Sequence, residues 1–234
     1  MIRHRLSAAV RFVDAFTLRP IDVPLDVRAE ALPIVVGMPS LPWRARRAPN
    51  DESYRFLVSN NTVMPVGAIA VDVTAPGDQY LNVEPLVVGL PRPLVAHPPT
   101  PARSDYLVQH RLWPTRRLPL PPSETAVVGR FISAGVSPIA GLKLTIWLDG
   151  TPMPPAPYAY SNERGEFVYR LPALKTVNGG VIAATASLQL DVRLPPAYAA
   201  PVAPTQIQTL DGVVLAVPFA LALGRVTTLT IALP

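Results

Sequence analysis

Two stretches of this sequence decide its fold: residues 10–28, VRFVDAFTLRPIDVPLDVR, and residues 128–146, VGRFISAGVSPIAGLKLTI. Each is an apolar strand followed by a turn, a Pro-Ile pair and a second apolar strand. The prolines of the two pairs, Pro20 and Pro138, lie 118 residues apart (138 minus 20). Internal similarity at this spacing predicts two copies of one structural module.

Two later landmarks repeat in the same order. Residues 51–58, DESYRFLV, match residues 162–169, NERGEFVY, because each is a polar turn followed by a strand. Residues 71–76, VDVTAP, likewise match residues 190–195, LDVRLP. Three landmarks in the same order strengthen the prediction of a tandem repeat.

The expected strands alternate apolar and polar residues with a period of two. Residues 142–146 and 188–193 show this alternation, which is typical of a sheet with one buried face. Phe56 and Phe167 each follow their polar turn, and we expect both to be core residues of equivalent strands. Short strands separated by Pro, Gly, Asn and Asp predict an all-β chain of two tandem immunoglobulin/transthyretin-like β-sandwich domains joined by a Pro-rich connector.

The expected domain boundaries follow from the repeat and from the distribution of proline. Residues 1–91 form a divergent sandwich, residues 92–123 a Pro- and Arg-rich connector, and residues 124–234 the second sandwich. The middle of the connector, Tyr106 to Trp113, is too apolar for a free linker. We therefore expect it to pack on a domain or to add a strand to one.

The composition indicates a folded, helix-poor chain. Of 234 residues, 49% are hydrophobic, 16% are charged and 30 are proline, and none is cysteine. Disulfides, thiolate nucleophiles and cysteine zinc sites are therefore excluded. Residues 1–16 do not resemble a signal peptide, and the apolar run 212–224 contains Pro218 and is too short to span a bilayer. We expect synthesis in the cytoplasm without membrane insertion.

The net charge of +5 comes mostly from arginine, notably in residues 43–47 and 111–117. Basic runs with a neighbouring aromatic residue can bind nucleic acid through phosphate contacts and stacking. An arginine-biased composition alone gives the same pI near 9.9, so we favour the reading without nucleic acid.

Residues 126–131, 137–144 and 162–167 carry a resemblance to a known family. This pattern of strand, Pro-Ile-x-Gly strand and Gly hairpin resembles the carboxypeptidase regulatory-like, transthyretin-like domains, over roughly Thr125 to Pro234. The first half departs from the pattern, with Arg11 and Ser53 where glycines would stand. The resemblance implies a seven-stranded sandwich used for accessory, adhesion or assembly roles, with no catalytic residues to transfer.

Patterns that carry chemistry are absent from the sequence. The three histidines, His4, His97 and His110, have no partner at metal-ligand spacing, and there is no nucleophile elbow or phosphate-binding glycine loop. Residues 162–166 contain oxygen ligands for a hard cation, but a hairpin turn with Gly165 explains them better. We therefore predict no enzyme, no metal, no cofactor and no small-molecule substrate.

The remaining expectation is a non-catalytic structural or assembly protein whose partners are other protein subunits. Our specific hypothesis is an accessory or baseplate-like component of a phage-tail-like contractile injection particle, released or intracellular. The alternative is a carbohydrate-binding or adhesion module that uses exposed aromatic rings. The candidate partner-binding residues are Tyr106, Leu107, Arg111, Leu112, Trp113, Arg116, Arg117, Tyr158 and Tyr160.

Overall fold

The computed structural model shows an all-β protein. It describes residues 4–29, 43–49, 52–59, 67–90, 107–122, 124–133, 137–148, 151–152, 158–171, 184–191, 217–221 and 223–233. Within these ranges every regular element is a strand except one 3-10 turn, η1 (Pro76–Asp78). The chain divides into two compact units. Unit 1 comprises Met1–Asp14, Leu18–Asp78 and Glu84–Leu112, and unit 2 comprises Ala15–Thr17, Gln79–Val83 and Trp113–Pro234.

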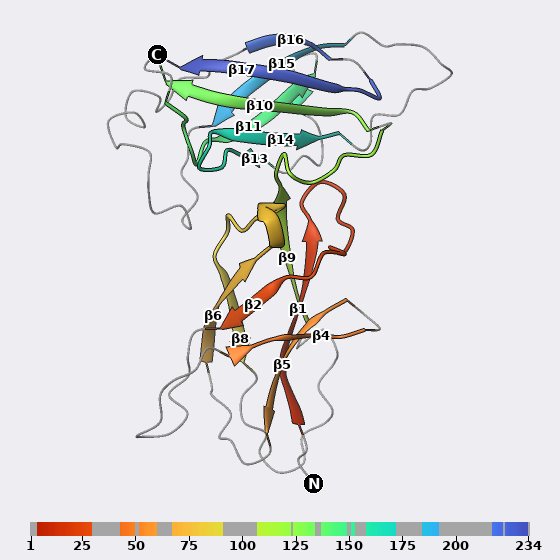
Figure 1. Cartoon of the computed structure of the whole chain (residues 1–234), viewed down its shortest axis with the longest axis vertical. Coiled ribbons are helices and arrows are strands. Elements are labelled where there is room, and N and C mark those ends of the chain that lie inside the picture. The colour runs from red at the N-terminus through yellow and green to blue at the C-terminus, as the bar shows by residue number, and fades with distance from the viewer. Residues whose placement is uncertain are drawn as a thin grey trace. The chain divides into compact units, whose positions relative to one another are not determined.

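Unit 1 is a sandwich of two sheets, with strand orders β4-β5-β1-β9 and β3-β2-β6-β8 (Figure 1). Its strands are β1 (His4–Asp14), β2 (Asp26–Ala29), β3 (Trp43–Arg44), β4 (Arg46–Arg47), β5 (Tyr54–Ser59), β6 (Gly67–Thr74), β8 (Leu86–Leu90) and most of β9 (Leu107–Pro114). Side-chain contacts join the two sheets. The Trp43 ring meets the Phe56 ring edge-on at 5.1 Å, and the Tyr54 hydroxyl accepts a hydrogen bond from the Leu25 N–H at 2.7 Å.

Unit 2 repeats this architecture with sheets of order β14-β10-β17 and β12-β11-β15-β16, and β13 also pairs with β11. Its strands are β7 (Tyr80–Leu81), β10 (Ala126–Ser133), β11 (Lys143–Leu148), β12 (Thr151–Pro152), β13 (Ala159–Tyr160), β14 (Glu166–Arg170), β15 (Ala184–Asp191), β16 (Val217–Leu221) and β17 (Val226–Leu233). The last two residues of β9, Trp113 and Pro114, belong to unit 2 and pair there with β7.

The repeat seen in the sequence corresponds to equivalent strands. The isolated bridge between Val13 and Pro20 in unit 1 has its counterpart between Ile132 and Pro138 in unit 2. The next residue donates the same backbone bond in both, from Ile21 to the Phe12 carbonyl and from Ile139 to the Phe131 carbonyl, each 3.1 Å long. Both Pro-Ile pairs therefore follow the first strand of a sandwich and pair back onto its end.

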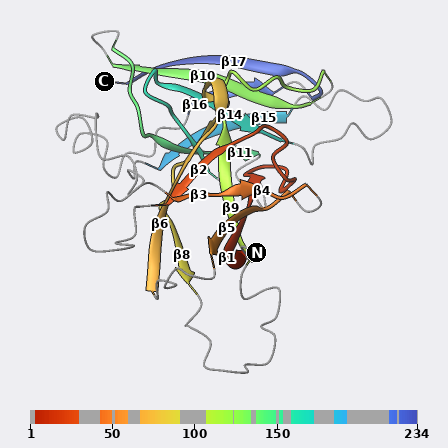
Figure 2. The same cartoon turned by 60° about the horizontal axis from the view of Figure 1, so that its bottom comes forward.

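In each unit two strands that are distant in sequence lie side by side and run parallel (Figures 1 and 2). Ala9–Asp14 of β1 pair in register with Leu107–Leu112 of β9. Ala126–Ser133 of β10 pair in the same way with Val226–Leu233 of β17. All the other strand pairs among the described residues are antiparallel.

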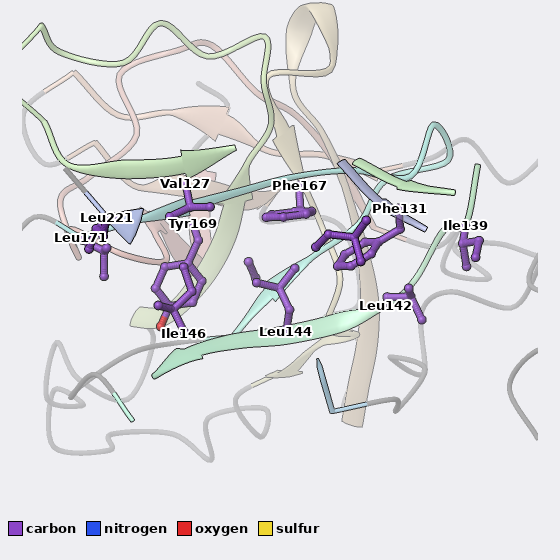
Figure 3. Packing of buried hydrophobic residues seen from close by; sticks show 12 residues of the cluster. Val127, Phe131, Ile139, Leu142, Leu144, Ile146, Phe167, Tyr169, Leu171 and Leu221 are labelled. Atoms are coloured by element: carbon purple, nitrogen blue, oxygen red, sulfur yellow. The ribbon is translucent and has the colours of Figure 1, made fainter. Parts of the chain in front are cut away.

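The core of unit 2 is built around Phe131 and Phe167, whose rings stack with centroids 4.8 Å apart. Figure 3 shows Leu144 of β11 beside Phe167, so both sheets contribute to this core. Phe167 is 1% exposed and Phe56 of unit 1 is fully buried. The prediction that both phenylalanines are core residues is confirmed.

The middle of the expected connector is part of a sheet. Leu107–Pro114 forms β9, and six of its residues pair with β1. Burial alternates along its middle, with His110 and Leu112 buried and Gln109 and Arg111 exposed. Residues 92–106 and Ser123 of the expected connector lie outside the described part of the chain, and the domain boundaries drawn from the sequence remain predictions.

Candidate interaction surfaces

The nine residues expected to bind a partner differ in their exposure. Arg111, Arg116, Arg117 and Tyr158 are exposed, and Leu107 is partly buried. Leu112, Trp113 and Tyr160 are buried, and Tyr106 lies outside the described residues. The arginines and Tyr158 are therefore the members of this set whose side chains are accessible at the surface.

Trp113 is held inside unit 2. Its ring meets the Tyr160 ring edge-on at 5.2 Å, and its Nε1–H donates to the Tyr158 carbonyl at 2.6 Å. Ala15 and Val83, from the two short segments that join unit 2, complete this small apolar cluster. The hydrophobic driving force attributed to Trp113 is therefore satisfied within the chain.

Tyr158 and Tyr160 do not form a shared exposed platform. Tyr158 is 39% exposed, whereas Tyr160 is 8% exposed and packs on Trp113. The Lys143 ammonium lies 3.3 Å from the centroid of the Tyr158 ring, which is a cation–π contact. One face of the exposed ring is therefore occupied by Lys143.

The polar hairpin at residues 162–166 is a structural turn. The Asn162 Oδ1 accepts hydrogen bonds from the backbone N–H groups of Arg164 and Glu166, each 2.9 Å long. Gly165 has a φ of 71°, a conformation that glycine adopts without strain. The predicted hairpin is confirmed. Among the residues that the structure describes, no group of three or more His, Asp or Glu side chains could hold a metal ion.

His110 lies in the core of unit 1. Its ring packs edge-on against Phe12 with centroids 5.9 Å apart, and burial lowers its pKa to about 4. At neutral pH this imidazole is therefore uncharged. The side chain of His4 and all of His97 lie outside the described residues.

Four arginines share the outward face of one sheet in unit 1, a grouping that the sequence analysis missed. Arg11 of β1, Arg55 of β5 and Arg111 of β9 alternate with buried core residues of their strands, and Arg46 of β4 is the direct cross-strand neighbour of Arg55. We call these four residues the arginine face. Two of them come from the basic runs 43–47 and 111–117, which the sequence analysis considered separately. Strand alternation assigns the outward positions, but strand order was needed to place them together.

No helix in the described ranges is long and apolar enough to cross a membrane.

Among the comparisons with known proteins, only the one with solved structures found similarity to this chain. No family model and no curated protein matches the sequence. The chain is similar to the Bacillus anthracis TIE protein at 10% identity and a TM-score of 0.29, covering 97% of this chain but only 34% of that one. It covers 62% of a streptococcal ancillary pilin, with 14% identity and a TM-score of 0.25.

Two further matches are of similar length to this chain. The minor pilin GBS52 of Streptococcus agalactiae is 12% identical, with a TM-score of 0.29 and coverage of 97% of this chain and 95% of that one. The shaft pilin SpaA of Lactobacillus rhamnosus GG is 10% identical, with a TM-score of 0.29 and coverage of 97% and 98%. At TM-scores this low, the similarity does not extend to function.

Proposed function

We propose that this chain is a non-catalytic structural protein that carries tension between the molecules it connects, in adhesion or in a protein assembly. The observation that carries the proposal is the parallel pairing of β1 with β9 in unit 1 and of β10 with β17 in unit 2. In unit 2, β10 begins at one end of this ladder and β17 finishes at the other end, because the two strands run in the same direction.

This geometry determines how tension acts on the hydrogen bonds. A pull between the start of β10 and the end of β17 draws the two strands past each other along their length, so it loads the whole ladder together. Eight residue pairs share the load in unit 2 and six share it in unit 1. If the strands were pulled apart from one end, the bonds would break one after another, each at lower force. The unfolding rate determines how a protein resists force. A ladder whose hydrogen bonds share the load keeps that rate low.

The use of polar groups in unit 2 also supports a structural role. The Ser161 hydroxyl accepts a hydrogen bond from the Leu142 N–H and donates one to the Ile139 carbonyl, both 2.9 Å long. Arg170 and Glu124 form a bidentate ion pair with side chains 10% and 8% exposed. Both sets of groups hold neighbouring segments of backbone or sheet in place.

Within this role we favour an adhesive or fibre-forming protein over a component of a phage-tail-like particle. Tension along the chain is what such a protein experiences, and no observation among the described residues favours the particle. The carbohydrate-binding alternative keeps Tyr158 as its exposed ring but not Tyr160, which is buried. Protein subunits are therefore the partners that we propose.

Single-molecule force spectroscopy tests the load-bearing geometry. The chain has no cysteine, so attachment points can be introduced as unique cysteines. In the shear variant, the 234-residue chain carries Pro122→Cys and a cysteine added after Pro234. In the peeling variant, it carries Pro122→Cys and Arg225→Cys, which lie at the same end of the β10–β17 ladder because Ala126 pairs with Val226.

The expected result is a markedly higher unfolding force for the shear variant than for the peeling variant at the same loading rate. The two variants contain the same core and the same ladder, so a difference in force reports the direction of loading. Equal forces in the two variants would show that the parallel ladder bears no special load, and the proposal would fail.

A further inference from the structure

We propose that two copies of this chain pair through β17, each adding its own β17 to the other in antiparallel orientation. Among the described strands β17 has one neighbour, β10, and it ends the sheet β14-β10-β17 (Figure 1). We call the side of β17 that faces away from β10 the free edge. The inference names a partner subunit and so rests on the proposed structural role for its purpose, but not on the load-bearing geometry.

The backbone of β17 alternates between β10 and the free edge. The Ala126 N–H donates to the Arg225 carbonyl at 3.2 Å, and a Cβ on Gly129 would come within 2.9 Å of the Leu229 carbonyl oxygen. Residues 225 and 229 therefore point their backbone groups toward β10, and the residues between them point the other way. Four residues, which we call the edge residues, present both N–H and C=O to the free edge: Val226, Thr228, Thr230 and Ala232.

The side chains of the edge residues show that this side of β17 is accessible. On the outward face of β10, Ala126 is fully buried and Val128 is 6% exposed. Their partners in register on β17 differ, because Val226 is 46% exposed and Thr228 is exposed as well. Thr230 and Ala232 are also exposed. The cover over this face of the sheet therefore stops before β17.

The other strands that end the described sheets are short or carry residues that oppose pairing. Four of them, β3, β4, β7 and β12, have two residues each. Pro218 interrupts β16, Glu166 and Arg170 stand at the ends of β14, and β8 has five residues that include Gly89. In contrast, β17 has eight residues, with no charge, proline or glycine among them. Such an edge pairs readily with another strand unless it is protected.

The corresponding strand of unit 1 is protected. β9 pairs in parallel with β1 as β17 pairs with β10, but it carries the exposed Arg111 and ends at Pro114. Charged side chains and proline are the usual means by which proteins block pairing at a sheet edge. Two copies of β9 would bring their arginines close together, whereas two copies of β17 bring no like charges together.

The edge residues are complementary to a second copy of themselves. With a two-fold axis at Leu229, antiparallel pairing sets Val226 opposite Ala232 and Thr228 opposite Thr230. Each is a hydrogen-bonded pair, in which the two residues exchange both N–H···O=C bonds. Every backbone group that the edge residues point outward then has a partner. Because the two-fold contact uses the same edge of both copies, it closes that edge and stops at the dimer.

The side chains at the axis also favour this occupant. Leu229 lies on the core side of the sheet, where it is partly buried and packs against the core of unit 2. At the axis it forms a non-hydrogen-bonded pair with Leu229 of the second copy, a position where Cα atoms are about 4.5 Å apart. The two leucines then cover each other's remaining apolar surface. On the outward face, threonine stands opposite threonine, a pair that stabilises sheets.

Sedimentation equilibrium of the 234-residue chain tests the proposal, with charge variants of the edge. The test variants are Thr228→Lys/Thr230→Lys and Thr228→Glu/Thr230→Glu, since each sets like charges opposite each other across the axis. An equimolar mixture of the two sets opposite charges there instead. The control is Thr74→Lys/Val87→Lys, which adds the same charge as the lysine variant at exposed positions of unit 1. Circular dichroism melts confirm that each variant is folded.

The wild-type mass should rise with concentration from 25.2 kDa toward twice that value. Each test variant should dimerise with a dissociation constant at least about tenfold higher, and the control should behave like the wild type. The mixture should regain the dimer at low salt, where opposite charges attract most strongly. A wild-type chain that stays monomeric up to about 1 mM, an equal loss in the control, or a mixture that stays monomeric would each overturn the proposal.

Hydrogen exchange of the wild-type chain provides a test that needs no variant. Amide exchange in peptides from β17 should slow as the protein concentration rises, because the outward N–H groups become bonded in the dimer. Peptides from β8, the other long uncharged edge, should not change. A dimer in which β17 exchanges at the same rate as in the monomer would place the interface elsewhere. The force experiment uses single chains, so its failure and the failure of this pairing are distinguishable.

Discussion

Gly129→Ala should destabilise unit 2 by about 1–2 kcal/mol. A Cβ at this position of β10 would overlap the Phe167 ring and come within 2.9 Å of the Leu229 carbonyl oxygen. Overpacking of this kind costs about 1–3 kcal/mol, and the lower entropy of the unfolded chain returns about 0.4–1 kcal/mol. The net cost should be substantial because neither neighbour can move easily. Phe167 is stacked on Phe131, and Leu229 belongs to the β10–β17 ladder.

Gly89→Ala in β8 is the matched control, because a Cβ there would meet no atom within 4 Å. Urea unfolding gives the free energy of each variant, and native-state hydrogen exchange of β10 peptides reports unit 2 by itself. Gly89→Ala should be neutral or stabilise by up to about 1 kcal/mol. If Gly129→Ala has as small an effect as Gly89→Ala, the close packing of Phe167 on β10 is wrong.

Three further predictions concern buried groups. Phe167→Ala should cost about 3–5 kcal/mol of unit 2 stability in urea unfolding, and an unchanged midpoint would mean that the ring is exposed. Glu124→Ala should cost about 3–5 kcal/mol because it removes the carboxylate that binds the largely buried Arg170 guanidinium in two places. Arg116→Ala removes a more exposed pair with Glu166 and should cost less than about 1 kcal/mol. Similar losses in both variants would contradict the difference in burial. Burial lowers the pKa of His110 from 6.5 in the unfolded chain to about 4, so the unfolded state binds the extra proton between these values. Its contribution to stability should be complete above about pH 6.5 and fall by up to about 3 kcal/mol as the pH drops toward 4. His110→Gln should remove this part of the pH dependence, and a parallel profile for both proteins would show that His110 is not its source.

The all-β fold could be predicted from the sequence because it depends on local signals that repeat. The Pro-Ile pairs at Pro20 and Pro138 follow equivalent strands, and the alternation along residues 142–146 placed Leu144 and Ile146 in the core. One segment was harder to assign, because the two strands that pair there are far apart in the sequence. Proline density suggested a connector through residues 92–123, yet part of that segment is β9, the partner of a strand about a hundred residues earlier. Parallel pairing between such distant segments leaves no local pattern.

The candidate surfaces were harder to predict, for the same physical reason. Trp113 looked like an exposed contact residue because its partners, Tyr160 and the segments around Ala15 and Val83, are remote in sequence. The arginine face was missed because Arg46 and Arg111 become neighbours in one sheet only through the strands between them. Composition indicated the excess of positive charge but could not show where it gathers.

The parallel pairing of β1 with β9 also affects how unit 1 can be made. Ala9 pairs with Leu107, so the partner of β1 is synthesised 98 residues later (107 minus 9). At about 5–20 residues per second, a ribosome needs roughly 5–20 s to produce that stretch. During this interval β5 can already pair with one side of β1, while the other side has no β9 to accept its backbone hydrogen bonds. An open strand edge in a nascent chain invites pairing with other chains. The chain is therefore most prone to aggregate during translation on crowded polysomes, before β9 has been made.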